Sequence, residues 1–172
     1  MTIFVAYKAL AELGLPVFQA SRLFRTPCFP VGAGPDYINA AACVTLRHGM
    51  TAAGVLAILH AVETRFGRAR QGRWAGRTLD IDLLAMDDSV LPDAETQTWW
   101  RNLVLRDQLR LAPDTVILPH PRLQDRGFVL VPLAEVAGGW VHPVLGLSVA
   151  EMLAARPAAE VATVIPLTEE GE

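Results

Sequence analysis

The chain of 172 residues has few cysteines and lacks a long uninterrupted apolar run. Cys28 and Cys43 are its two cysteines. They are too few for a disulfide scaffold, and we interpret them as the reduced thiols of a cytoplasmic protein. No stretch of about 18 consecutive apolar residues is present that could span a membrane as a helix. No basic segment precedes the first apolar residues, so we expect no secretory signal.

The chain also has no large excess of positive or of negative charge. The formal net charge is -3 and charged residues make up 19% of the chain, which argues against a nucleic-acid coat or a polybasic membrane binder. Apolar residues make up 52%, which excludes a disordered or fibrous chain. The length suits one domain, since domains usually span roughly 100–200 residues. We expect a single domain over residues 1–172, with a frayed acidic tail from about residue 160.

Lysine is almost absent. Lys8 is the only lysine among the 15 basic residues, and the other 14 are arginines. This bias reflects either genome composition or a need for side chains that grip phosphate oxygens with two hydrogen bonds. Lys8 does not stand in a Gly-Lys-Ser/Thr motif, so a P-loop is excluded. The Gly-x-Gly at residues 32–34 lacks the third glycine of a dinucleotide-binding motif.

Apolar periodicity and capping residues predict a mixed set of elements. Helices and strands alternate without a regular β-α-β rhythm, so we expect the α+β class. The expected helices cover Ile3–Leu13, a segment from an N-cap at Thr51 to about Phe66, Trp99–Leu111, part of Arg126–Val136, and Ser148–Ala155. The expected strands cover Val17–Phe24, Tyr37–Leu46 and Thr78–Met86.

The last of these strands carries a pair of carboxylates. Residues two apart in a strand point to the same face, so Asp80 and Asp82 project together while Leu79, Ile81 and Leu83 face the core. Two adjacent carboxylates repel each other unless a cation lies between them. Oxygen ligands of this kind suit Mg²⁺, which fills its other positions with water and substrate phosphates. A solvated edge strand with alternating polar residues is the alternative.

An arginine-rich segment directly precedes the carboxylate pair. Five arginines fall within residues 65–77, at positions 65, 68, 70, 73 and 77, together with three glycines. So basic a loop in an acidic protein indicates a polyanionic ligand, and a polyphosphate bridged by Mg²⁺ accounts for both features. A merely solvated loop is the alternative. Trp74 is suited to stack on a flat ring, although a place in the core explains it equally well.

These residues carry a resemblance to a known family. The block Arg73–Leu84 resembles the signature of 6-hydroxymethyl-7,8-dihydropterin pyrophosphokinase, an enzyme family of folate synthesis. Other blocks resemble the family's further motifs in the same order along the chain: Phe24–Pro27, Pro35–Ala41, Leu118–Arg122 and Asp125–Leu133. Together the blocks cover most of the chain from about residue 3 to 154.

The resemblance implies a fold and a reaction. The implied fold is a ferredoxin-like α+β sandwich, an antiparallel sheet with helices packed on its faces. The implied reaction moves the pyrophosphoryl group of ATP to the hydroxymethyl group of the dihydropterin and releases AMP. The implied partners are these two small molecules, with no nucleic acid and no membrane, and the implied state is a monomer.

The resemblance also implies a role for particular residues. Asp80 and Asp82 would hold two Mg²⁺ ions, and Arg68 and Arg77 would stabilise charge on the transferring phosphates. The implied ATP-binding residues are Glu63, Arg70, Arg73, His120 and Arg126. The implied pterin-binding residues are Thr26, Pro27, Tyr37 and Asn39, with Trp74 and Phe128 sandwiching the ring.

Three departures from the family pattern stand out. The first helix begins almost at Met1, so we expect the family's first strand, which ends in Gly-Ser-Asn, to be missing. The 38 positions from Asp82 to His120 imply an insertion at about residues 91–113. Pro121 replaces an aromatic residue that often follows the histidine. A non-catalytic relative that binds nucleotide and pterin is therefore the main alternative to an active enzyme, and a nucleic-acid binder using the arginine loop is a weaker one.

Overall fold

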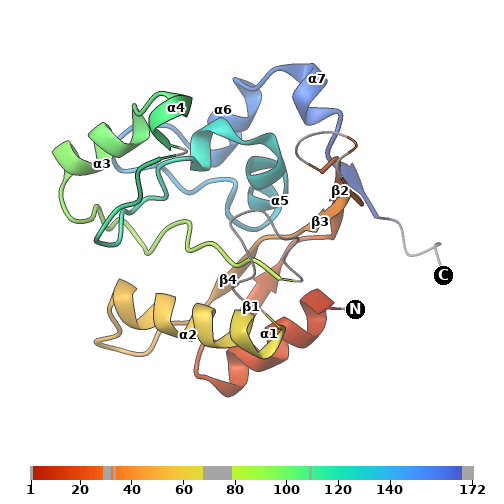
Figure 1. Ribbon diagram of the computed structural model, residues 1–172, viewed down its shortest axis with the longest axis vertical. Helices are drawn as coiled ribbons and strands as arrows, with labels where there is room; N and C mark the ends of the chain where they lie inside the picture. Colours follow the sequence, from red (N-terminus) through yellow and green to blue (C-terminus); the bar gives the residue numbers. More distant parts are fainter. Residues whose placement is uncertain (1, 29–31, 33, 68–78, 109, 168–172) are drawn as a thin grey trace.

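The computed structural model describes residues 2–28, 32, 34–67, 79–108 and 110–167. Two helices, α1 (Thr2–Glu12) and α2 (Ala52–Arg65), lie side by side on one side of the strands (Figure 1). The remaining helices lie on the other side. They are α3 (Ala94–Arg101), α4 (Leu105–Gln108), the 3-10 turn η1 (Leu123–Asp125), α5 (Gly127–Ala137), α6 (Val149–Ala154) and α7 (Ala158–Val161). In the described part of the chain, no helix is both long and apolar enough to cross a membrane.

The strands form two small antiparallel sheets, which confirms the α+β class. One sheet pairs β1 (Val17–Ala20) with β4 (Ala42–Val44), and the other has the order β3-β2-β5. The strands of the second sheet are β2 (Phe24–Thr26), β3 (Tyr37–Asn39) and β5 (Ile165–Pro166).

Each of the first two expected strands is divided into two shorter ones. Val17–Phe24 is interrupted between β1 and β2, and Tyr37–Leu46 is interrupted between β3 and β4. At the interruption the Ser21 hydroxyl accepts a hydrogen bond from the Ala41 N–H at 2.9 Å. The Ser21 N–H donates to the Ala41 carbonyl at 2.9 Å. A side chain thus takes the place of one ladder bond, which the alternation of apolar residues does not reveal.

Local signals located α1 and α2 correctly. Gly14 adopts a φ of 94° just beyond α1, a conformation that glycine reaches without a steric penalty. Thr51 caps α2 as expected, because its hydroxyl accepts the Gly54 N–H at 3.2 Å. These two helices bury the first apolar cluster, which contains Leu10, Leu15, Val55, Leu59 and Val62.

A second apolar cluster lies under the later helices. It joins η1, α5 and α6 through Leu123, Leu130, Leu133, Val149 and Met152. The N-terminus of α6 is fixed by Ser148, whose hydroxyl and N–H exchange hydrogen bonds with Glu151. The expected helix at Ser148–Ala155 is therefore confirmed. The helix expected within Arg126–Val136 is also present, because α5 begins at Gly127 and ends one residue past that segment, at Ala137.

The expected strand Thr78–Met86 is wrong for its described residues. Residues 79–86 are extended but belong to neither described sheet. The Ile81 N–H donates to the Glu63 carboxylate at 3.0 Å, and the Leu84 carbonyl accepts the His120 N–H at 2.8 Å. In this segment, one hydrogen bond to a side chain and one to a single backbone group take the place of a ladder of strand pairing. The alternation is still present, because Leu79, Ile81 and Leu83 pack against the first cluster.

Two further corrections concern the second half of the chain. The expected helix at Trp99–Leu111 begins earlier, at Ala94, because the Asp93 carboxylate caps α3 by accepting the Thr96 N–H at 2.8 Å. A short second helix, α4, follows it. Where a frayed tail is expected from about residue 160, the structure has α7 and β5. The Glu160 carboxylate accepts the Gly127 N–H at 2.6 Å, which ties α7 to the start of α5.

Candidate active site

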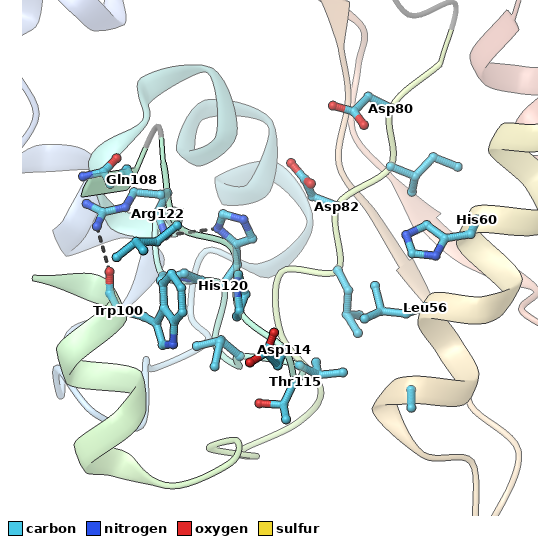
Figure 2. A pocket seen from close by; sticks show the side chains of 18 of the residues that line it. Leu56, His60, Asp80, Asp82, Trp100, Gln108, Asp114, Thr115, His120 and Arg122 are labelled. Carbon is cyan, nitrogen blue, oxygen red and sulfur yellow. Dashed lines mark hydrogen bonds between the residues drawn. The ribbon is translucent and has the colours of Figure 1, made fainter. Parts of the chain in front are cut away.

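A cavity of about 850 Å³ lies between α2, residues 80–83 and the stretch from Trp100 to Arg126. Its lining includes carboxylates, two histidines and two arginines (Figure 2). These charged or titratable residues are His60, Glu63, Asp80, Asp82, Asp114, His120, Arg122 and Arg126. The structure therefore brings five of the residues expected from the sequence to one cavity, together with His60, Asp114 and Arg122.

Asp80 and Asp82 project from the extended segment to the same side. Figure 2 shows both carboxylates turned away from α2, toward the wall that carries His120. Both side chains are exposed, so they can take ligands from solvent. Two hard oxygen donors on an open wall fit Mg²⁺, which keeps several waters and accepts phosphate oxygens. Among the described residues, no three His, Cys, Asp or Glu side chains are close enough together to hold one metal ion, as a metal cage made only of protein ligands would need.

Glu63 holds the backbone between the two aspartates. It lies on α2 with only 1% of its surface exposed, and its Oε1 accepts the Ile81 N–H at 3.0 Å. A carboxylate that binds a backbone N–H fixes the chain at that point. The bond ties the carboxylate-bearing segment to α2.

His120 lies on the wall facing the aspartates. Its Nδ1 accepts the Arg122 N–H at 3.1 Å, so the neutral ring carries its proton on Nε2. Burial lowers the pKa of His120, and the charges of Arg126 and Arg122 lower it further, while the charge of Asp82 acts in the opposite direction. The imidazole is thereby kept as a neutral hydrogen-bond donor.

Arg122 is a residue of this site to which the sequence analysis assigned no role. Its side chain is only 14% exposed and forms an ion pair with Asp125 at 2.8 Å. Its Nη2 donates to the carbonyl oxygens of Trp100 at 2.8 Å and Leu103 at 3.2 Å. The motif Leu118–Arg122 contains this arginine and could have drawn attention to it. The two carbonyls that it binds, however, belong to residues about 20 positions earlier in the chain.

The residues expected to bind a pterin lie on the second sheet and at the start of α5. The Asn39 Nδ2 donates to the Thr26 Oγ1 at 2.7 Å, and Tyr37 pairs with Thr26 across the strands. Phe128 is 39% exposed, with the Arg126 guanidinium 5.7 Å from its ring centre. Thr26, Pro27, Tyr37, Asn39 and Phe128 do not line the cavity described above.

Five expected site residues lie outside the described part of the chain. They are Arg68, Arg70, Arg73, Trp74 and Arg77.

Comparison with known proteins places the chain in a family. The family model for 7,8-dihydro-6-hydroxymethylpterin-pyrophosphokinase (HPPK) matches residues 2–138. The chain belongs to the HPPK family. The match includes every site residue named above, and it ends just after α5 (Gly127–Ala137).

Relatives named as pyrophosphokinases or as folate synthesis proteins align over most of the chain. A 2-amino-4-hydroxy-6-hydroxymethyldihydropteridine pyrophosphokinase of Synechocystis is 38% identical over 149 residues, which cover 84% of this chain and 65% of that protein. A protein of the same name from Methylorubrum extorquens is 31% identical over 127 residues, covering 74% of this chain and 66% of its own length. A mitochondrial folate synthesis bifunctional protein of Arabidopsis thaliana is 29% identical over 139 residues, covering 79% of this chain and 21% of its own length. The chain thus spans about two thirds of the length of these first two relatives.

Proposed function

We propose that the chain transfers the pyrophosphoryl group of ATP to the hydroxymethyl group of 6-hydroxymethyl-7,8-dihydropterin, with release of AMP, in folate biosynthesis. The observation that supports this most is the placement of Asp80 and Asp82 on one wall of a large cavity, opposite a neutral His120. The family membership supplies the substrate class.

Asp80 and Asp82 are the residues suited to hold Mg²⁺, and two ions are proposed. When bound, Mg²⁺ neutralises negative charge on the phosphates. Glu63 maintains the spacing of the two carboxylates through its bond to Ile81. In transfers of this type the protein mainly positions the reactants and stabilises charge, so a rigid acidic wall is the required feature.

The opposite wall is suited to bind the polyphosphate of ATP. The His120 Nε2–H is a neutral donor, and the guanidinium groups of Arg122 and Arg126 line the same cavity. Arginine pairs with phosphate oxygens through two parallel hydrogen bonds. Arg122 already donates to two carbonyls and an aspartate, so Arg126 is the proposed direct phosphate ligand of the two.

The pterin is proposed to bind beside the second sheet. With its amide nitrogen donating to Thr26, Asn39 is held in one orientation and presents its carbonyl oxygen as an acceptor. A pterin edge offers both donors and acceptors, which an amide can match. Phe128 offers an exposed ring face for stacking on the flat ring.

The finer features implied by the family are proposed in the same way. They are a ferredoxin-like arrangement of one domain over residues 1–172, a monomeric state, a cytoplasmic location, and ATP and the dihydropterin as partners rather than nucleic acid or membrane. The two antiparallel sheets with helices on both sides support the first of these.

An assay of AMP formation tests the proposed activity. The purified protein is incubated with ATP and Mg²⁺, with and without the hydroxymethyl-dihydropterin. We expect AMP to form only when the pterin and Mg²⁺ are both present. Binding of ATP and pterin without formation of AMP would contradict the proposal and support a non-catalytic relative.

A further inference from the structure

The segment of residues 91–113 forms part of the cavity wall. It contains α3 and α4, and five of its side chains line the same cavity as the aspartates and His120. These lining residues are Trp100, Leu103, Gln108, Leu111 and Pro113. The insertion expected from the sequence therefore borders the candidate active site.

Three sets of hydrogen bonds attach this segment to the stretch that carries His120. Leu91 and Leu118 exchange two backbone hydrogen bonds, at 2.8 and 3.1 Å. The Gln97 side chain is completely buried, and its Nε2 donates to the Pro119 carbonyl at 3.1 Å. The Arg122 guanidinium binds the carbonyls of Trp100 and Leu103. A wall attached before α3, along α3 and in the turn that follows it is suited to hold a ligand group in one place.

The cavity combines charged and apolar lining. The carboxylates and the two arginines supply the charge, and His120 adds a neutral hydrogen-bond donor. The apolar lining includes Leu56, Leu83, Trp100, Leu103, Leu111 and Ile117. Figure 2 shows Leu56 on α2 and the Trp100 indole on the opposite wall, below Asp82 in this view. A nucleoside triphosphate likewise has a charged part and an apolar part, since its phosphates are charged and its base is a flat, weakly polar ring.

We propose that Trp100 is a base-stacking residue that sets the affinity of the cavity for ATP. This inference rests on the proposed function, because it assigns the base of the co-substrate to the apolar part of the same cavity. Trp100 has the largest flat side chain of the apolar lining, and Arg122 fixes its backbone carbonyl at 2.8 Å. An aromatic side chain that stacks on a base contributes to affinity without contacting the phosphates.

A pair of substitutions on α3 tests the role of Trp100. Trp99 and Trp100 contact each other edge to face with ring centres 5.0 Å apart. Trp99→Leu and Trp100→Leu therefore both remove this contact, but of the two rings only that of Trp100 lines the large cavity. Calorimetry measures the binding of ATP and of inorganic triphosphate to each protein in the presence of Mg²⁺.

We expect Trp100→Leu to weaken the binding of ATP about tenfold, as the loss of one base–aromatic stack implies. Its binding of inorganic triphosphate should stay within about twofold of the unsubstituted protein, and Trp99→Leu should change neither ligand. Unchanged ATP binding in Trp100→Leu would overturn the proposal, as would an equal loss for both ligands. If Trp100→Leu is recovered unfolded, Trp100→Met provides the same comparison with a larger apolar side chain.

The outcome separates this inference from the proposed function. If the unsubstituted protein forms AMP and Trp100→Leu binds ATP equally well, the stacking role alone is wrong. If the unsubstituted protein binds neither ATP nor triphosphate, the proposed function fails and the stacking role fails with it.

Discussion

The two aspartates and Glu63 show how single residues define the acidic wall. Asp80 and Asp82 are exposed to the cavity, whereas Glu63 is buried and binds the N–H of the residue between them. Because their surroundings differ, these carboxylates have different roles. The exposed pair is available to ligands, and the buried one supports the backbone.

The first prediction concerns Asp82. Asp82→Ala should lower turnover by a factor of about 100 to 1,000, as is usual when one group that stabilises transition-state charge is removed. The free energy of unfolding should not fall, because the substitution relieves repulsion between two carboxylates when no metal is bound. The rate of AMP formation and chemical unfolding measure the two effects.

Asp88→Ala is the matched control for this prediction. Asp88 is exposed and does not line the cavity, so its removal should leave both turnover and stability unchanged. Near-normal turnover in Asp82→Ala would refute the role of Asp82 in holding Mg²⁺.

The second prediction concerns Glu63. Glu63→Ala removes the acceptor of the Ile81 N–H, whereas Glu63→Gln keeps an oxygen at that place. A buried donor left without an acceptor costs about 1–3 kcal/mol. We therefore expect Glu63→Ala to have a lower free energy of unfolding than Glu63→Gln by this amount, measured by urea denaturation. Equal stability of the two variants would show that the bond does not hold the segment.

At the scale of elements, α3 and α4 determine the shape of one cavity wall. Neither helix packs closely against another helix or strand of the described chain, and α3 with the turn after it is attached by hydrogen bonds to residues 118–122. Among these bonds, those of Arg122 involve a charged donor, and such bonds contribute more than neutral ones.

The third prediction therefore concerns Arg122. Arg122→Met removes both hydrogen bonds to the carbonyls of α3 and its following turn, and we expect the free energy of unfolding to fall by about 2 kcal/mol. The KM for ATP should rise more than kcat falls, because the substitution loosens a binding wall and leaves Asp80 and Asp82 in place. Steady-state kinetics with varied ATP separates the two constants.

Arg106→Met serves as the control on α4. The Arg106 side chain is 78% exposed, and its ion pair is with the adjacent Asp107, so stability and KM should be unchanged. A kcat that falls as much as the KM rises in Arg122→Met would contradict a role limited to positioning.

The elements differ in how far the sequence predicts them. The start of α2 follows from Thr51, a local capping signal, and α6 follows in the same way from Ser148. The segment 79–86 has the right alternation but forms no described ladder, because one of its N–H groups is bound by a side chain of α2. β5 depends on a pairing with β2, which lies far away in the sequence. A local sequence pattern predicts hydrogen bonds between neighbouring residues. The segment 79–86 and β5 depend instead on hydrogen bonds to residues far away in the sequence.

In the candidate site too, some residues are evident from the local sequence and others only from the folded structure. The pair Asp80 and Asp82 is evident from spacing alone, and in the structure both line the same cavity as His120. Arg122 and Trp100 are not evident, since their significance depends on how the α3–α4 segment docks against residues 118–122.

At the scale of the whole molecule, His142 is a buried titratable group in the turn that precedes α6. It is completely buried, and its Nδ1 accepts hydrogen bonds from the N–H groups of Val144 and Leu145, each at 3.2 Å. Burial lowers the pKa of His142, and the charge of Arg101 on α3 lowers it further. Protonation would remove the acceptor that both N–H groups use.

The fourth prediction follows from this lowered pKa. Between the unfolded pKa of about 6.5 and the lower folded value, the unfolded chain binds more protons than the folded one. The free energy of unfolding should therefore be constant above about pH 7 and should fall as the pH drops below about 6.5, by up to about 1.4 kcal/mol per pH unit for each such histidine. His120 contributes in the same direction, because its pKa is also lowered.

His142→Asn isolates the share of His142. An asparagine oxygen can accept the same N–H groups and does not titrate, so the loss of stability from pH 7 to 5.5 should be smaller than in the unsubstituted protein. Thermal unfolding at these two pH values measures it. An identical loss in both proteins would show that His142 does not contribute to the pH dependence.

The central claim, that this chain transfers a pyrophosphoryl group, is tested most directly by the products of a single reaction mixture. Phosphorus NMR of the protein with ATP, Mg²⁺ and the hydroxymethyl-dihydropterin identifies where each phosphate goes. We expect AMP and a pterin diphosphate in equal amounts, and neither product with Asp82→Ala. Formation of ADP and a pterin monophosphate, or of AMP with free pyrophosphate, would contradict the claim.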